Sequence, residues 1–134
     1  MALIVLDASA AVAVLLNLGT AASAIRERLD GSDEGPHVPH LFEIEVLSAL
    51  RRRALAHDLS EKRGSELVED LASMRLNRYP HTALVRRMWE LNENVTIQDS
   101  AYIALAEILD APLVTMDGRL ARAPGIRAAV EVYG

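Results

Sequence analysis

Two aspartates stand directly after short apolar segments of the chain. Asp7 follows residues 3–6 (LIVL) and Asp117 follows residues 113–116 (LVTM). Short continuous apolar runs with branched side chains are typical of buried parallel strands, and sites in open parallel sheets form beyond the carboxyl ends of the strands. We therefore expect both carboxylates at one edge of a sheet. Each aspartate alone is also open to a structural interpretation, because Asp at a strand-to-helix junction commonly caps the helix.

Asp99 lies near the start of a helix predicted over residues 96–109. Its structural alternative is the acidic end of a Thr-x-x-Asp capping box that begins at Thr96. That helix is apolar almost all round, so its start is expected to be buried. A buried carboxylate is costly unless something positive pairs with it. No Lys or Arg lies within one turn of Asp99 in the sequence, so the positive partner must come from elsewhere.

Glu45 lies in the middle of a predicted helix. Glu43 is two residues away, about 200° around the helix axis, so the two glutamates cannot serve one site. Glu45 shares its face with Arg52, and a helix salt bridge with Arg52 or Arg53 is as well supported by the spacing as a catalytic role. Spacing alone leaves both interpretations open.

The four carboxylates carry a clear chemical implication if they converge. Carboxylates held close together cannot all stay ionised without cations, and the cations that accept ligand sets made only of oxygen are Mg²⁺ and Mn²⁺. One such ion, or a pair about 4 Å apart, supports in-line attack on a phosphodiester. Convergence of Asp7, Glu45, Asp99 and Asp117 would therefore indicate a nuclease, and the spacing permits it without requiring it.

The elements that must position these residues alternate along the chain. Strands or extended segments are expected at residues 3–6, 38, 74–79, 112–116 and 128–132, the last at an edge of the sheet. Helices are expected at residues 8–18, 20–30, 39–57, 60–73, 80–91 and 96–109, with a short helical turn at 117–122. Strands alternating with helices predict an α/β fold with a mostly parallel sheet.

Length and composition narrow the class of protein. With 134 residues the chain is expected to form one domain, residues 1–134. It has no cysteine, which excludes disulfides and thiolate metal sites. No apolar stretch approaches the roughly 18 residues of a membrane span, and the start of the chain does not resemble a signal peptide. These features favour a cytoplasmic protein that does not contact membranes.

The net charge of −5 argues mildly against nucleic acid as a partner. The arginines are clustered, however, and a local basic face can exist on an acidic protein. The alternative for each cluster is a solvated helix face. The clusters are Arg51-Arg52-Arg53, Arg75 with Arg78, Arg86-Arg87, and Arg119 with Arg122.

Several segments together resemble the PIN-domain family, and in particular the VapC toxins of VapBC toxin–antitoxin systems. Each segment is weak evidence by itself, but they occur in order, with spacings like those of the family, over nearly the whole chain. The segments are residues 6–10 (LDASA), 38–41 (VPHL), 45–50 (EVLSAL), 78–81 (RYPH), 99–107 (DSAYIALAE) and 113–120 (LVTMDGRL).

The resemblance implies a three-layer α/β sandwich whose central, mostly parallel sheet of about four to five strands is flanked by helices. It implies a metal-dependent endoribonuclease in which Asp7, Glu45, Asp99 and Asp117 line one acidic pocket and hold Mg²⁺ or Mn²⁺, with Ser9 and Thr115 as supporting polar residues. It also implies an RNA substrate, a homodimer, and a VapB-type antitoxin that covers the pocket with a basic side chain. Arg51, Arg52, Arg53 and Arg119 are the expected RNA contacts.

One departure from the family pattern concerns the metal. Some relatives carry a further carboxylate just after the fourth acidic motif, where this chain has Gly118-Arg119, so a second metal position is in doubt. Two alternatives keep the fold: an RNA-processing nuclease that is not a toxin, and an inert PIN domain that only binds. A phosphatase that forms an aspartyl-phosphate is disfavoured, because position 9 is Ser9 where such enzymes need a second aspartate.

Other polar and aromatic residues are not expected to take part in the chemistry. The four histidines have no spacing typical of a metal site and are predicted on the surface or in loops: His37, His40, His57 and His81. Trp89 is predicted in the core or in a dimer interface, because it shares an apolar stripe with Val85. A chain this poor in aromatic residues does not indicate a base-stacking surface.

Overall fold

The computed structural model describes residues 3–32 and 34–134 of the chain. Within them it has five strands, seven α-helices and one 3-10 helix. The strands are β1 (Val5–Leu6), β2 (His37–Pro39), β3 (Asn77–Tyr79), β4 (Leu113–Thr115) and β5 (Val130–Val132). The helices are α1 (Ala8–Leu15), α2 (Gly19–Asp30), α3 (Phe42–Leu55), α4 (Glu61–Ala72), η1 (His81–Ala83, the 3-10 helix), α5 (Val85–Glu90), α6 (Ile97–Leu109) and α7 (Gly118–Arg122).

The strands form one sheet in the order β3-β2-β1-β4-β5, and every neighbouring pair is parallel. β1 is central, with Val5 paired to His37 of β2 and to Leu113 of β4. The chain builds outward from β1 on one side through β2 and β3, then crosses to add β4 and β5 on the other side. In such sheets the crevice for ligands opens where the order reverses, at the carboxyl ends of the strands. Here that point lies between β1 and β4.

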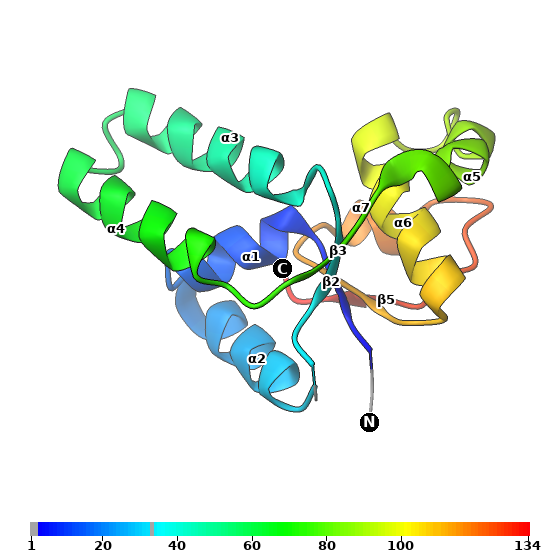
Figure 1. Ribbon diagram of the computed structural model, residues 1–134, viewed down its shortest axis with the longest axis horizontal. Helices are drawn as coiled ribbons and strands as arrows, with labels where there is room; N and C mark the ends of the chain where they lie inside the picture. Colours follow the sequence, from blue (N-terminus) through cyan, green and yellow to red (C-terminus); the bar gives the residue numbers. More distant parts are fainter. Residues whose placement is uncertain (1–2, 33) are drawn as a thin grey trace.

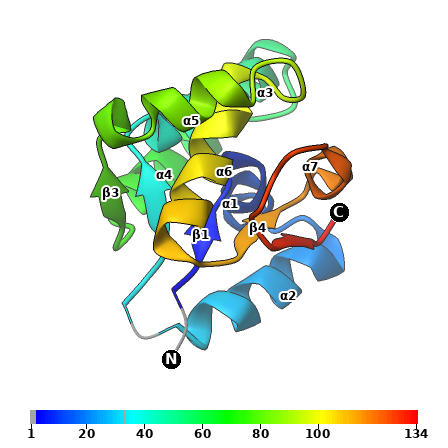
Figure 2. The same ribbon diagram turned by 90° about the vertical axis from the view of Figure 1, so that its right-hand side faces the viewer.

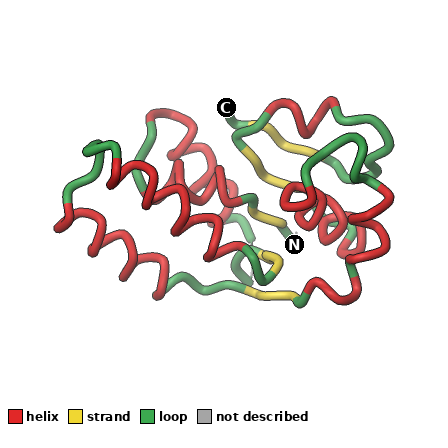
Figure 3. Tube along the Cα trace, turned by 90° about the horizontal axis from the view of Figure 1, so that it is seen from above, coloured by secondary structure: helices red, strands yellow, loops and turns green. Residues whose placement is uncertain are grey.

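Helices cover both faces of the sheet, so the predicted three-layer α/β fold is confirmed. Figure 1 shows α1 to α4 on one side of the strands, and α5 and α6 on the other. The view from above separates the same two helical layers by the strands (Figure 3). Figure 2 shows α7 close to β4 and to the C-terminus. The strand predicted at residues 128–132 is β5, and it is an edge strand as expected.

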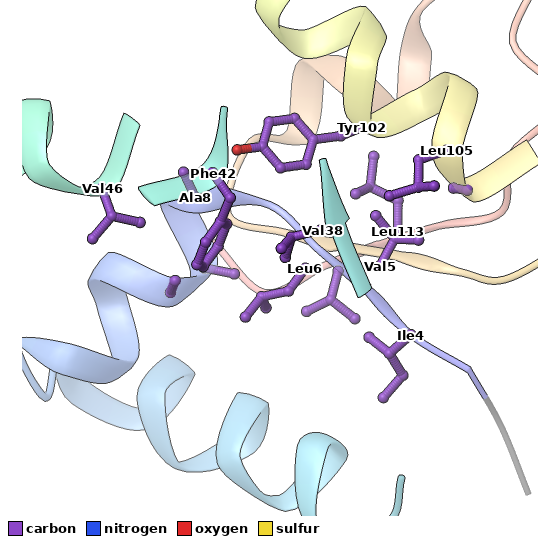
Figure 4. Packing of buried hydrophobic residues seen from close by; sticks show 14 of the residues in the cluster. Ile4, Val5, Leu6, Ala8, Val38, Phe42, Val46, Tyr102, Leu105 and Leu113 are labelled. Carbon is purple, nitrogen blue, oxygen red and sulfur yellow. The ribbon is translucent and has the colours of Figure 1, made fainter. Parts of the chain in front are cut away.

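The core is aliphatic and centred on β1. Ile4, Val5 and Leu6 are fully buried, because helices cover both faces of this strand. Figure 4 shows these side chains between Phe42 of α3 and Leu105 of α6. A strand buried on both faces needs apolar side chains at every position, which explains the continuous run LIVL directly before Asp7. The core thereby fixes the place where that aspartate emerges.

Three predicted helix boundaries are wrong. The helix expected over residues 8–18 ends at Leu15, and the one expected over 39–57 begins at Phe42, because Pro39 belongs to β2. Proline is tolerated at this last position of β2 because β1 pairs with β2 only at His37. The helix expected over 80–91 is divided into η1 and α5.

One prediction for a single side chain fails, and one of the two alternatives for another, the core position of Trp89, is excluded. His37 was expected on the surface or in a loop, but it begins β2 and is only 3% exposed. Its Nδ1 lies 2.7 Å from the Tyr79 hydroxyl and its Nε2 lies 2.9 Å from a Glu34 carboxylate oxygen. Trp89 is 69% exposed and is therefore not a core residue. Helix α5 is too short to bury its whole apolar stripe, and the sheet side is covered by neighbouring Leu84 and Leu91.

Among the described residues, no helix is by itself long and apolar enough to cross a membrane. Helices α1 and α2 reach such a length and composition only when taken together, and they are bent by 110° relative to each other.

Candidate active site

A pocket of about 520 Å³ opens at the carboxyl ends of β1 and β4. Four carboxylates from four different elements line it. They are Asp7 after β1, Glu45 on α3, Asp99 on α6 and Asp117 after β4. The structure thus brings together all four acidic residues singled out in the sequence. Glu43 is directed elsewhere, as its spacing from Glu45 requires, and its carboxylate lies 2.6 Å from Arg78 Nε.

Asp7 is the most buried of the four carboxylates, at 5% exposed. It occupies the N-cap position of α1, yet its side chain makes no capping hydrogen bond. Instead Ser9 Oγ and Thr115 Oγ1 both donate to Asp7 Oδ2, at 2.8 and 2.6 Å. Asp7 is therefore not a helix cap, and Oδ1 remains the freer oxygen of its carboxylate.

The same two hydroxyls join the loops that follow β1 and β4. Ser9 Oγ accepts a hydrogen bond from the backbone of Met116 at 3.1 Å, and Thr115 Oγ1 accepts one from the backbone of Asp117 at 3.0 Å. Burial raises the pKa of Asp7, against the opposing effect of the hydrogen bonds from Thr115 and Ser9. The orientation of the Asp7 carboxylate is thus fixed, while no positively charged side chain pairs with it among the described residues.

Glu45 and Asp99 are half-buried across the pocket from Asp7. Burial is the main reason that the pKa of each is raised, and the Asp7 charge raises both further. Glu45 makes no salt bridge with Arg52 or Arg53 within the described part of the chain, so the helix salt bridge that its spacing allowed is not formed. Three mutually repelling carboxylates with raised pKa values are the expected state of a site that is completed by positive charge.

Tyr102 is a residue that the sequence analysis missed. It is fully buried on α6, and its hydroxyl points toward the start of α3, where Glu45 lies (Figure 4). This hydroxyl, as a nearby donor, lowers the pKa of Glu45, although the two groups lie outside the geometry of a formed hydrogen bond. The available signal was its spacing: Tyr102 follows Asp99 by three residues and so shares its helix face.

Asp117 differs from the other three carboxylates because it already has a positive partner. Arg119 Nη2 lies 2.6 Å from Asp117 Oδ2, Arg119 Nε lies 3.0 Å from Oδ1, and the Arg119 backbone N–H donates to Oδ1 at 2.9 Å. The capping interpretation therefore holds for Asp117, the N-cap of α7. The Arg119 guanidinium also keeps the pKa of Asp117 below its usual range.

The donor set of the pocket fits a divalent cation of the magnesium type. Every acidic ligand candidate is a carboxylate, and oxygen is the ligand atom that Mg²⁺ and Mn²⁺ favour. The loosely held Tyr102 hydroxyl beside Glu45 is a buried donor that an ordered carboxylate would satisfy. Among residues 3–32 and 34–134, no three acidic or histidine side chains yet stand at the mutual distances of a formed metal site. Binding would have to draw them together.

The arginines expected to contact RNA divide into three groups. Arg52 and Arg53 line the acidic pocket. Arg51 instead lines a separate groove between α3 and α4, so the expectation that it lies next to the pocket is wrong. Successive residues of a helix are rotated by about 100° around its axis. Arg51 therefore points to a different side of α3 from Arg52. Arg119 lines a neighbouring pocket that shares Asp99 with the first.

Comparison with known proteins gives consistent results. The family model described as the PIN domain matches residues 4–126. Ribonuclease VapC1 of Mycobacterium tuberculosis is 40% identical over 129 residues, which cover 96% of this chain and 96% of that protein. Ribonuclease VapC12 of the same organism is 39% identical over 130 residues, which cover 97% and 98% respectively.

Among solved structures, DNA-bound VapBC from Salmonella typhimurium contains a chain that matches with a TM-score of 0.72. The match covers 100% of both chains at 19% sequence identity. At this level of identity the likeness is one of fold alone. Because the match covers the full length of both chains, the two proteins share the same three-layer architecture.

Proposed function

The chain belongs to the PIN-domain family, and we propose that it is a metal-dependent endoribonuclease, the toxin of a VapBC-type toxin–antitoxin pair. The proposal treats residues 1–134 as one PIN domain that acts on RNA in the cytoplasm. The two relatives compared above, at about 40% identity, both carry the name ribonuclease. The observation that carries the proposal is the meeting of Asp7, Glu45, Asp99 and Asp117 in one pocket.

The proposed cofactor is Mg²⁺ or Mn²⁺, held by these four carboxylates. Such an ion, when bound, supplies an acidified water and neutralises the charge that develops on a phosphodiester under attack. Asp7 offers an oxygen whose direction is fixed by Ser9 and Thr115. Glu45 and Asp99 are proposed to complete the ligand set from the helices on either side. Arg52 and Arg53, which line the acidic pocket, and Arg119, which lines the neighbouring pocket, are proposed to contact the RNA backbone.

The test is cleavage of total cellular RNA by partner-free protein with Mn²⁺ or Mg²⁺, against a chelator control. Asp7→Asn and Glu45→Gln are expected to abolish cleavage, because each removes a charge from the metal site. Glu43→Gln is the matched control for Glu45: it lies on the same helix and pairs with Arg78 outside the pocket. It should leave cleavage at the wild-type rate.

Three other outcomes would redirect the proposal. Loss of cleavage in the Glu43→Gln protein to the same degree as in Glu45→Gln would show that the acidic pocket is not specifically required. Absence of cleavage, combined with no heat of Mn²⁺ binding in calorimetry, would favour a PIN domain that only binds. RNA cleavage by the purified protein, combined with no neighbouring reading frame that encodes an inhibitor, would favour an RNA-processing nuclease that is not a toxin.

The proposed antitoxin is a small protein that places a basic side chain among the carboxylates. The proposal is supported by the meeting of Asp7, Glu45 and Asp99 in one pocket, where each carboxylate lacks an ion pair among the described residues. The antitoxin gene would lie next to the gene for this chain. Co-expression of that neighbouring reading frame should yield a complex that does not cleave RNA until the partner is removed. A neighbouring product that neither binds nor inhibits would contradict the toxin assignment.

The proposed homodimer uses the exposed apolar face of α5. Val85 and Trp89 are 53% and 69% exposed and lie four residues apart, on one face of the helix. An exposed tryptophan beside a second apolar side chain is typical of an interface. Trp89→Lys should convert a dimer to a monomer in analytical ultracentrifugation. Val68→Lys, which also replaces an exposed apolar side chain by lysine but lies on α4, should not. A wild-type monomer at all concentrations would contradict the proposal.

A further inference from the structure

Asp117 and Asp7 are held in opposite ways. Asp7 is buried and fixed by two hydroxyl groups, whereas both oxygens of Asp117 are bound by the forked guanidinium of Arg119. The side chain of Arg119 is 80% exposed. The two residues are two positions apart at the start of α7. Among the described contacts, Asp117 is the only partner of the Arg119 guanidinium.

An exposed ion pair of this kind is weak. Such pairs contribute at most about 1 kcal/mol, and a divalent cation in a site of several carboxylates competes for the same oxygens with twice the charge. Asp117 must therefore exchange one positive partner for another when the pocket takes up a metal ion. The released guanidinium keeps the geometry that suits a phosphate as well as a carboxylate.

A second pocket lies within reach of that guanidinium. It measures about 440 Å³, shares Asp99 with the acidic pocket, and includes Asn92, Asn94 and Thr96 in its wall. Among the described residues that line it, Arg119 is the sole basic one. A nucleic acid strand passing from one pocket to the other would meet the negative charges of Asp99 and Glu93, which both line the second pocket. Only Arg119 could offset that repulsion from within the second pocket.

We propose that Arg119 is a phosphate-binding residue gated by the metal: it occupies Asp117 in the metal-free protein and moves to an RNA phosphate in the second pocket when a divalent ion takes Asp117. This inference rests on the proposed function, and it concerns how metal and RNA binding are coupled. The RNA strand would then run past Asp99, with Asn92, Asn94 and Thr96 facing the nucleotide next to the cleaved bond.

The exchange makes two affinities respond to Arg119→Ala in opposite directions. Mn²⁺, titrated by calorimetry into partner-free protein without RNA, should bind about two- to fivefold more tightly, because a competing ion pair is gone. RNA affinity, measured by anisotropy of a fluorescein-labelled oligouridine checked for integrity after each titration, should fall about fivefold when Mn²⁺ is present. Substitution of a residue that only supports the fold would not raise the affinity for Mn²⁺ and lower the affinity for RNA.

The salt dependence gives an independent measure of the phosphate contact. In Mn²⁺ the slope of log affinity against log salt should decrease in magnitude by about 0.7, the value for one phosphate contact on a single strand. In chelator the change should be smaller, since Arg119 is then held by Asp117. Arg122→Ala is the matched control: it removes the same charge from the same helix but forms no ion pair with Asp117 in the described structure.

The outcomes separate this inference from the proposed function. Equal Mn²⁺ affinity in the Arg119→Ala and Arg122→Ala proteins, or an unchanged salt slope in Mn²⁺, would overturn the gating by Arg119 while leaving a metal-dependent nuclease intact. Failure of the wild-type protein to bind Mn²⁺ at all would overturn both. Arg119→Lys should restore part of the RNA affinity, because charge is kept while the forked geometry is lost.

Discussion

Asp7 and Asp117 occupy the same local position, the N-cap of a helix after a parallel strand, and yet their side chains behave differently. The difference arises from their neighbours. Thr115 and Ser9 draw Asp7 away from the helix end, whereas Asp117 accepts the Arg119 backbone N–H as an ordinary cap does. At the scale of single residues, the hydroxyl groups decide which aspartate has a fixed direction.

Replacing Thr115 by Val keeps the shape of the side chain and removes its hydroxyl. Asp7 Oδ2 then loses its shorter hydrogen bond, of 2.6 Å, and the Asp117 backbone N–H loses its acceptor. We expect Mn²⁺ affinity and cleavage rate to fall by about 10- to 100-fold, the usual effect of removing a group that orients a metal ligand. Calorimetry and RNA cleavage measure both. Thr82→Val, on the exposed side of η1, is the control, and equal losses in the two variants would contradict the role of Thr115.

Tyr102→Phe removes only the buried hydroxyl beside Glu45. Because that hydroxyl has no formed hydrogen bond within the described residues, the free energy of unfolding should stay the same or rise by about 1 kcal/mol. Mn²⁺ affinity should fall a few-fold, since the donor that favours ionised Glu45 is lost. Urea unfolding and calorimetry distinguish the two effects. A less stable protein with unchanged Mn²⁺ affinity would show that Tyr102 serves packing alone.

At the scale of elements, the loop between α2 and β2 fixes where the second strand enters the sheet. Gly35 has φ of +74°, and a Cβ built there would lie 2.7 Å from the Arg75 carbonyl oxygen. Gly35→Ala should therefore lower the free energy of unfolding by about 2 kcal/mol or more. Gly31→Ala, where the nearest atom lies at 3.6 Å and φ is −76°, should change it by less than about 1 kcal/mol. Urea denaturation of both variants tests this, and similar losses in both would be contrary to expectation.

The elements also show what the sequence can and cannot predict. The order of strands and helices followed from apolar runs such as LIVL before Asp7, since a strand buried on both faces has little choice of residues. Boundaries failed where a residue type suits two roles: Pro39 fits the first turn of a helix as well as the end of a strand. His37 was misplaced because its burial depends on the pairing of β2 with β3, which brings Tyr79, 42 positions away, within 2.7 Å of its ring.

For the site, the four acidic residues could be named in advance, but their surroundings could not. The contacts of Asp7 with Thr115 span 108 positions of the chain. The loose contact of Tyr102 with Glu45 joins α6 to α3 in the same way. Such contacts depend on how the sheet and its helices assemble, which periodicity does not record. The resemblance to a family identified the acidic residues, and the geometry showed how they differ from one another.

At the scale of the whole molecule, the acidic pocket opposes the stability of the metal-free fold. Burial and mutual repulsion raise the pKa values of Asp7, Glu45 and Asp99 in the folded state. Above the ordinary carboxyl pKa of about 4, the folded protein thus binds more protons than the unfolded chain, and stability falls as pH rises toward the raised values. The loss is complete once the pH exceeds the raised pKa values.

Asp99→Asn should remove part of this electrostatic destabilisation. Without metal at pH 7, its Tm should exceed that of the wild type by about 3 °C, and the decrease in stability with rising pH should be smaller. Added Mn²⁺ should raise the Tm of the wild type more than that of the variant. Thermal unfolding in chelator over a pH series measures this, with Asp58→Asn at an exposed loop position as control. A lower Tm for Asp99→Asn than for Asp58→Asn at pH 7 would argue against an electrostatic cost at the pocket.

The hydroxyl links between Asp7, Ser9, Thr115 and Asp117 have a consequence for the synthesis of the protein. They join residues from the two ends of the chain, and β4 must pair with β1 before Asp7 acquires its fixed direction. A growing polypeptide on the ribosome therefore carries Asp7 and Glu45 long before it carries Asp117. Until translation has passed β4, the nascent chain lacks Thr115 and Asp117, so the acidic pocket is incomplete while most of the chain is being made.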